Sequence, residues 1–238
     1  SFTLPSLLSI VSTYLVLRWY FRKQLREPLP VDRERTHLTG NGRLVLVGIV
    51  VVALVLMVVS AINTDLGLPT CICALVITVV VALRARANPL KIVRRVSWSV
   101  LPLVAGLFIL MEAMVWIGAM RYTSAALAWT EKLPVAIGTI LTGTVVGIAN
   151  NVVNNLPLGL IAGSTLNSTH VHGAIENAVL VGIDLGPNLS VTGSLATILW
   201  LIAMRREGLH VDFVTFLKVG ALAMPVALLL ALITVAVL

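Results

Sequence analysis

The chain has 238 residues, of which 58% are hydrophobic and only 11% are charged. A water-soluble domain needs a more polar exterior than this composition supplies. The composition therefore excludes a soluble globular protein. Because the apolar runs are continuous and do not alternate with polar residues, we predict an all-α membrane protein.

The net charge of +7 would suggest a nucleic-acid partner in a soluble protein. In a membrane protein, Lys and Arg instead concentrate in cytoplasmic loops, so we expect no nucleic acid. The two cysteines, Cys71 and Cys73, are too few for a disulfide framework or a multi-thiolate metal site. Residues two apart on a helix do not share a face, so we expect both to be packing residues. No metal site and no cofactor are predicted.

Five apolar stretches are long enough to cross the hydrocarbon core as helices, which takes about 20 residues. In chain order they cover residues 2–21, 44–62, 66–83, 96–120 and 219–238. The fourth stretch contains a single acid, Glu112.

The basic residues predict the orientation of these spans. Fifteen of the seventeen Lys and Arg fall at the end of the first span or in the regions 23–43, 84–95 and 205–218. Placing these regions in the cytoplasm leaves only Arg121 and Lys132 outside. We therefore expect a multi-pass protein of the bacterial inner membrane with a periplasmic C-terminus.

The apolar pattern is interrupted twice between residues 134 and 204. Residues 134–149 could form a helix of about 24 Å, but "NNVVNNLP" then places four Asn and a Pro where hydrocarbon is expected. Only eight apolar residues, 156–163, follow. A re-entrant hairpin at about 134–166, turning at residues 150–157, fits both lengths.

The second interruption lies in a helix predicted at about 173–204. Gly186 and Pro187 break it and leave unwound backbone near the middle of the membrane. We expect the helix to resume near residues 188–190, with its free N–H groups directed at a cavity. A final span is predicted at about 211–238.

The two interruptions carry polar side chains that both donate and accept hydrogen bonds. Broken helices that face one another are how secondary transporters build a substrate site, so we expect a pocket for a small, uncharged, hydroxyl-rich solute. The predicted substrate-binding residues are Asn150, Asn151, Asn154, Asn155, Asn188, Ser190 and Thr192. The alternative is that the Asn cluster only caps a helix end and satisfies hairpin backbone.

Two motifs, "NNVVNNLPLGL" and "GIDLGPNLSVTGSLATILWLIA", resemble the hairpin tip and broken helix of the bacterial arsenical pump membrane protein family, ArsB. The resemblance covers the whole chain. It implies one half of an inverted-repeat secondary transporter with a re-entrant hairpin and a discontinuous helix. Residues 1–22 would be the last helix of a missing first repeat, 23–43 a cytoplasmic linker, and 44–238 the second repeat.

The resemblance also implies a function: efflux of arsenite and antimonite by proton antiport with alternating access. The partners would be trivalent arsenic or antimony hydroxide, protons, the lipid bilayer and, in some systems, a soluble ArsA-type ATPase. Asp184 is the first candidate for the proton carrier and Glu112 the second; either acid could instead be a structural hydrogen-bonding group.

Two other functions remain open. The first is a secondary transporter of dicarboxylate-type anions, which the absence of Lys and Arg from residues 133–204 disfavours. The second is a membrane scaffold subunit that transports nothing. We expect no enzyme, because the sequence has no nucleotide-binding loop.

Overall fold

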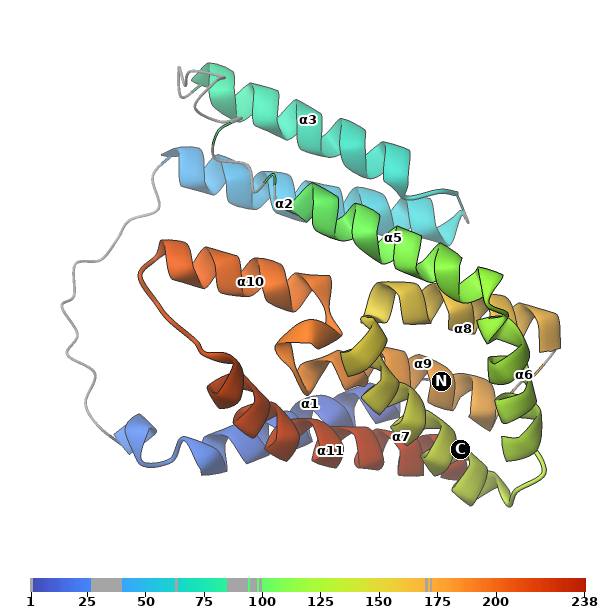
Figure 1. The fold of residues 1–238 in the computed structure, drawn as a ribbon. Helices are drawn as coiled ribbons and strands as arrows, with labels where there is room; N and C mark the ends of the chain where they lie inside the picture. The colour runs from blue at the N-terminus through green and yellow to red at the C-terminus, as the bar shows by residue number, and fades with distance from the viewer. Residues whose placement is uncertain are drawn as a thin grey trace. The chain divides into compact units, whose positions relative to one another are not determined.

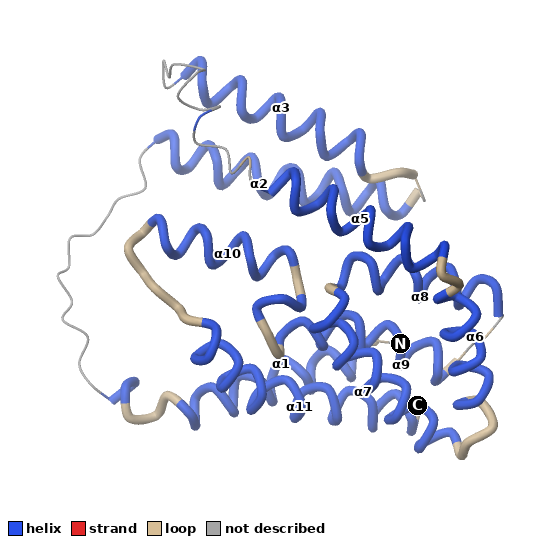
Figure 2. The backbone as a smooth tube through the Cα atoms, viewed as in Figure 1, coloured by secondary structure: helices blue, strands red, loops and turns tan. Residues whose placement is uncertain are grey.

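A computed structural model describes residues 2–26, 40–62, 64–84, 94, 98, 100–169, 171 and 173–238. Every regular element within these ranges is a helix, and short loops connect the helices (Figures 1 and 2). This confirms the predicted all-α class. The chain divides into two units, one formed by residues 29–99 and the other by residues 1–28 and 100–238.

The smaller unit contains two long apolar helices, α2 (Gly40–Ala61) and α3 (Gly67–Arg84). They pack against each other where Gly48 lies beside Ile77, since a Cβ at Gly48 would be 3.0 Å from the Ile77 side chain. Of the predicted linker, residues 27–39 lie outside the described residues, as do residues 85–93 of the next predicted loop.

The larger unit holds all the other described helices. In chain order they are α1 (Thr3–Tyr20), η1 (Gln24–Arg26), α5 (Val100–Trp116), α6 (Ala119–Thr130), α7 (Val135–Val153), α8 (Asn155–Thr169), α9 (Ala174–Leu185), η2 (Gly186–Asn188), η3 (Val191–Gly193), α10 (Leu195–Arg206) and α11 (Phe213–Val237).

The short helix α9 is at the centre of this unit, where it packs against α7, α8 and α11. One buried cluster joins α9 to α11 through Val181, Leu228 and Leu232. A second cluster joins α9 to α6 through Val179 and Leu127. Two faces of α9 are therefore buried, while Leu180 and Asp184 on a third face are exposed.

Glycines bring α7 and α9 together until their backbones touch. A Cβ at Gly182 would lie 2.6 Å from the Gly143 carbonyl oxygen, and one at Gly186 would lie 2.5 Å from the Gly147 carbonyl oxygen. Gly143 and Gly147 have the spacing of small residues that lets membrane helices approach closely. The spacing therefore serves helix packing here.

The predicted span at residues 96–120 contains a sharp bend. Helix α5 ends at Trp116, and α6 begins at Ala119 after a bend of 71°. Gly118 has φ +78°, a left-handed conformation that only glycine adopts without strain. The continuous hydrophobicity of this stretch concealed the turn.

Four described helices are long and apolar enough to cross a membrane: Gly42–Ala61, Gly67–Arg84, Val135–Val153 and Phe213–Val237. Counting the bent pair α5 and α6 as one span gives five. Helix α1 does not reach the same hydropathy, but it packs along α11 (Figure 1). The two run antiparallel, since Phe2 and Pro5 at the start of α1 line a cavity with Val235 and Leu238 at the end of α11.

Candidate functional site

The chain changes direction between α7 and α8 at one residue, Asn154. Its φ of 78° and ψ of 148° lie in a region almost restricted to glycine, and it is the single non-glycine residue with positive φ in the described part of the chain. Its N–H still bonds to the Asn150 carbonyl at 2.9 Å. A side chain in this conformation persists only when surrounding contacts hold it there.

The break after α9 leaves a carbonyl without its helical partner. Pro187 has no N–H, so the carbonyl of Ile183, four residues earlier, cannot be satisfied within the helix. Asn150 supplies the missing donor: its Nδ2 donates to the carbonyls of Ile183, at 3.0 Å, and Gly182, at 2.9 Å. Asn150 is fully buried, and its Oδ1 has no hydrogen-bond partner in the described residues.

Asn151 uses every hydrogen-bonding position of its amide. Its Nδ2 donates to the carbonyls of Gly147 and Gly186, both at 2.9 Å. Its Oδ1 accepts from the Ser190 N–H at 3.0 Å and from the Ser190 hydroxyl at 2.7 Å. A carboxamide offers two donors and two acceptor positions, so Asn151 is saturated in this conformation.

The exchange between the two breaks is reciprocal. The end of α7 leaves the Asn151 carbonyl without its helical donor, and the Thr192 hydroxyl donates to it at 2.8 Å. In return, Nδ2 of Asn154 donates to the Thr192 carbonyl at 2.8 Å. We call residues 150–154 and 182–192 together the joint. Each half of the joint supplies the hydrogen bonds that the break in the other half removes.

Two glycines let other segments close over the joint. A Cβ at Gly193 would lie 2.7 Å from Oδ1 of Asn151. A Cβ at Gly220, on α11, would lie 2.6 Å from the Asn188 carbonyl oxygen. The sequence analysis missed both residues, because a single glycine in an apolar segment does not reveal what approaches it.

The predicted site residues thus fall into two groups. Asn150, Asn151, Asn154, Ser190 and Thr192 come together and bond to one another or to backbone. Asn155 is half-buried, Asn188 is exposed, and neither side chain has a hydrogen bond in the described part of the chain. Of the amides at the two breaks, these two retain their full capacity.

The expected restart of the broken helix near residues 188–190 is wrong. Two 3-10 turns intervene, and α10 begins at Leu195, where the Ser194 hydroxyl caps it by accepting from the Ala196 N–H at 3.2 Å. Its first turn is therefore capped by its own chain. The unwound segment is longer than the Gly-Pro pair alone indicated.

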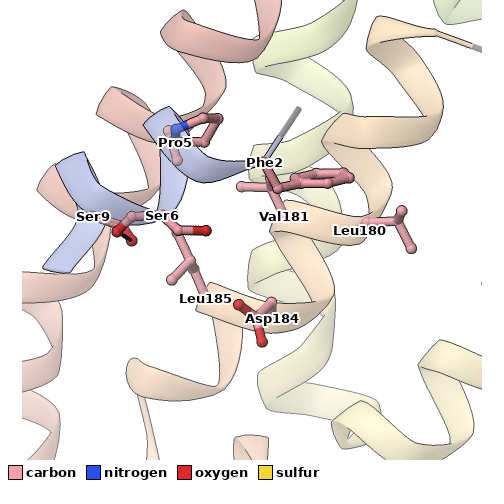
Figure 3. A pocket seen from close by; sticks show the side chains of 9 residues that line it. Phe2, Pro5, Ser6, Ser9, Leu180, Val181, Asp184 and Leu185 are labelled. Carbon is pink, nitrogen blue, oxygen red and sulfur yellow. Dashed lines mark hydrogen bonds between the residues drawn. The ribbon is translucent and has the colours of Figure 1, made fainter. Parts of the chain in front are cut away.

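The Asp184 side chain lies away from the hydrogen-bonded groups of the joint. Gly182 and Gly186 face α7, and Asp184 lies two residues from each, on the opposite side of α9. Its carboxylate faces the first turns of α1 (Figure 3), in a cavity of about 250 Å³ that Phe2 and Ser6 also line.

Glu112, the second candidate acid, is exposed on α5 and accepts a hydrogen bond from the indole N–H of Trp116 at 3.2 Å. This bond stays within one helix. Among the described residues, no cluster of three or more His, Cys, Asp or Glu could hold a metal ion, and Cys71 and Cys73 are both free thiols.

The joint explains why an Asn-rich tip and a Gly-Pro break occur together in this chain. The family model for the arsenical pump membrane protein matches residues 1–238. The chain belongs to this family.

Curated members of the family cover the same region. The arsenical pump membrane protein of Escherichia coli (strain K12) is 27% identical over an alignment of 230 residues, and the match covers 89% of this chain and 52% of the relative. That of Yersinia enterocolitica is 27% identical over an alignment of 178 residues, and the match covers 71% of this chain and 42% of the relative. The chain spans about half the length of these relatives. No solved structure gives a significant match.

Family membership and the apolar helices together make the chain a multi-pass α-helical membrane protein. The family's description names a membrane pump. The joint lies at the end of α7 and at the end of α9 with the 3-10 turns that follow it, at the two motifs that carried the resemblance.

Proposed function

We propose that the full-length protein exports trivalent arsenic and antimony hydroxides across the bacterial inner membrane. The observation that carries this proposal is the joint: two helix breaks whose backbone is satisfied by amides and hydroxyls, with no charged partner. Residues 133–204 contain no Lys or Arg. A neutral metalloid hydroxide offers hydroxyls that both donate and accept, which suits carboxamides better than it suits a cationic site.

In this proposal the joint shapes the site, and the free amides contact the solute. Asn150, Asn151 and Asn154, with Ser190 and Thr192, hold the two breaks in register. The side chains of Asn155 and Asn188 keep unused donors and acceptors. In this proposal they bind the hydroxyls of the solute. This assignment refines the sequence prediction, which gave all seven residues one role.

The proposed driving force is proton antiport with alternating access. Asp184 is the first proton carrier in this scheme, because it is the acid nearest the break in sequence and lines a cavity of its own. The proton and the solute would then use opposite sides of α9. Glu112 is the second candidate.

The coverage of about half the length of its relatives supports the proposed domain plan for this chain. Residues 1–22 end a first repeat, 23–43 form a cytoplasmic linker, and 44–238 form the second repeat with a re-entrant hairpin and a periplasmic C-terminus. The antiparallel packing of α1 on α11 supports this plan, since two terminal helices of related repeats would pair in this way. In some systems a soluble ArsA-type ATPase would bind the cytoplasmic side.

Arsenite accumulation in cells that lack their own efflux protein tests the proposal. Cells expressing the full-length protein should retain less arsenite, and equal retention with and without the protein would reject arsenite export. Asn188→Ala should raise retention, whereas Asn167→Ala, an exposed amide of α8, should not. A dicarboxylate carrier would instead change dicarboxylate uptake.

The proton step is tested by measuring arsenite uptake into everted membrane vesicles across which a pH gradient is imposed. Asp184→Asn should abolish the dependence of arsenite uptake on the gradient while Asn188→Ala should weaken apparent affinity and keep that dependence. If Asp184→Asn retains full pH dependence and Glu112→Gln loses it, the carrier is Glu112.

A further inference from the structure

All the charged side chains of residues 2–26 lie in the last turn of α1 or just after it, and all of them are basic. Three arginines, Arg18, Arg22 and Arg26, recur every fourth residue through the last turn of α1 and into η1. They line one groove of about 430 Å³ together with Leu15, Trp19 and Leu25. We call these six residues the basic groove.

Aromatic contacts orient two of the guanidinium groups. Nη1 of Arg18 donates to the Tyr14 hydroxyl at 3.3 Å, and Cζ of Arg22 lies 5.6 Å from the centre of the Trp19 ring. No carboxylate pairs with Arg18, Arg22 or Arg26 in the described residues. Their charge is therefore concentrated on one exposed face, with guanidinium N–H groups free to donate.

The packing of α1 places this groove at the end of a membrane helix. Because α1 runs antiparallel to α11, its arginine end lies beside the start of α11, which is long and apolar enough to cross the bilayer. Trp19, Tyr20 and Phe21 at this end are residues typical of the membrane–water boundary. The groove therefore lies at the level of the lipid headgroups.

We propose that the basic groove binds the phosphate of an anionic phospholipid. Guanidinium groups bind phosphate oxygens through paired hydrogen bonds, and basic pockets at the ends of membrane helices suit anionic headgroups. Leu15, Trp19 and Leu25 are 55%, 58% and 69% exposed in the same groove. These apolar walls fit acyl chains, whereas an inorganic anion or an acidic protein segment would leave them in water.

The test compares phosphatidylglycerol with phosphatidylcholine of the same acyl chains, retained by the purified full-length protein in native mass spectrometry. The unchanged protein should prefer phosphatidylglycerol. Replacing all three arginines (R18Q, R22Q, R26Q) should weaken phosphatidylglycerol retention by roughly a hundredfold, at about a factor of five for each charge. Retention of phosphatidylcholine should not change.

The matched control removes three other arginines, R43Q, R84Q and R205Q, which changes the net charge equally and lies outside the groove. If this control loses as much phosphatidylglycerol as the groove variant, the lipid is attracted by the net charge of the protein and not by the groove, and the proposal is overturned. Displacement by inorganic phosphate alone would show that the groove takes the free anion, and unchanged retention in the groove variant would favour a protein partner; either result overturns the proposal.

A second variant guards against loss of folding. R18K, R22K and R26K keep the charge and remove the paired guanidinium geometry. This variant should retain phosphatidylglycerol more weakly than the unchanged protein and more strongly than the glutamine variant. If the lysine variant retains phosphatidylglycerol as well as the unchanged protein does, positive charge alone is sufficient. That result would reject recognition by guanidinium groups.

Discussion

The larger unit interrupts its helices in two different ways, at the joint and at the bend between α5 and α6. At the joint, the groups freed by two breaks are satisfied by side chains more than thirty residues away. At the bend, the chain uses its own backbone: the N–H groups of Ile117 and Gly118 bond to the carbonyls of Ala113 and Val115, both at 3.0 Å. One interruption is tertiary and the other is local.

The difference shows what each break requires from the sequence. A tertiary break needs amides, which are costly in an apolar environment unless every group finds a partner. A local break needs one residue that tolerates positive φ, and Gly118 supplies it. The joint should therefore respond to the loss of side chains, and the bend should respond to the loss of glycine.

The largest expected effect is at Asn151. Asn151→Ala leaves the Ser190 N–H without a partner and removes one of the two hydrogen bonds that the Gly186 carbonyl accepts, which should lower the free energy of unfolding by about 2–4 kcal/mol. The measurement is the midpoint of thermal unfolding of the full-length protein in detergent. Asn167→Ala, the matched control, should leave the midpoint nearly unchanged. Equal midpoints for the two variants would contradict the tertiary character of the joint.

Glycine packing inside the joint gives the next effect. Gly186→Ala places a methyl group 2.5 Å from the Gly147 carbonyl oxygen, so the helices must separate, at a cost of about 1–3 kcal/mol. The same substitution at Gly163 on α8 meets no atom within 4 Å. Gly163→Ala should raise stability by up to about 1 kcal/mol, because alanine favours helix. Thermal unfolding distinguishes the opposite signs, and a gain at both positions would argue against close packing.

The bend should respond to backbone conformation and not to volume. An added Cβ at Gly118 also meets no atom within 4 Å, yet φ of +78° makes Gly118→Ala unfavourable by about 1–2 kcal/mol. Gly118→Asn should cost less, since asparagine tolerates this conformation better. If alanine and asparagine lower the unfolding midpoint equally, left-handed strain is not the cause.

The smallest effect tests another local device, the start of α11. The Asp212 carboxylate accepts from the Thr215 N–H at 3.1 Å, and hydrogen bonds from the Thr215 side chain and N–H lower the pKa of Asp212 below its ordinary value of 3.8. A lowered pKa contributes stability above the unfolded pKa and loses it as pH falls through the folded pKa. The unfolding midpoint of the unchanged protein should therefore fall slightly below about pH 4, and Asp212→Asn should remove this fall. If the variant shows the same fall, other carboxyl groups cause it.

The sequence predicted the fold class and most helix positions because hydrophobic length is a local property. It also predicted both polar interruptions, since four Asn near residue 150 and a Gly-Pro pair at 186–187 cannot continue an apolar helix. It missed the bend at Gly118, where an apolar run hides a turn that needs no polar residue. It placed the restart of the broken helix too early, because the two 3-10 turns depend on bonds to Asn151 and Asn154.

By itself, the sequence determined that this protein is helical, lies in a membrane and breaks its helices at two polar motifs, because length, composition and proline chemistry act within one segment. Only the tertiary structure decided what the amides do. Asn150, Asn151 and Asn154 satisfy the backbone of a distant break, while Asp184 faces a different cavity on the far side of α9. Hydrogen-bond partners and helix faces depend on which segments meet, and that is a property of the folded chain.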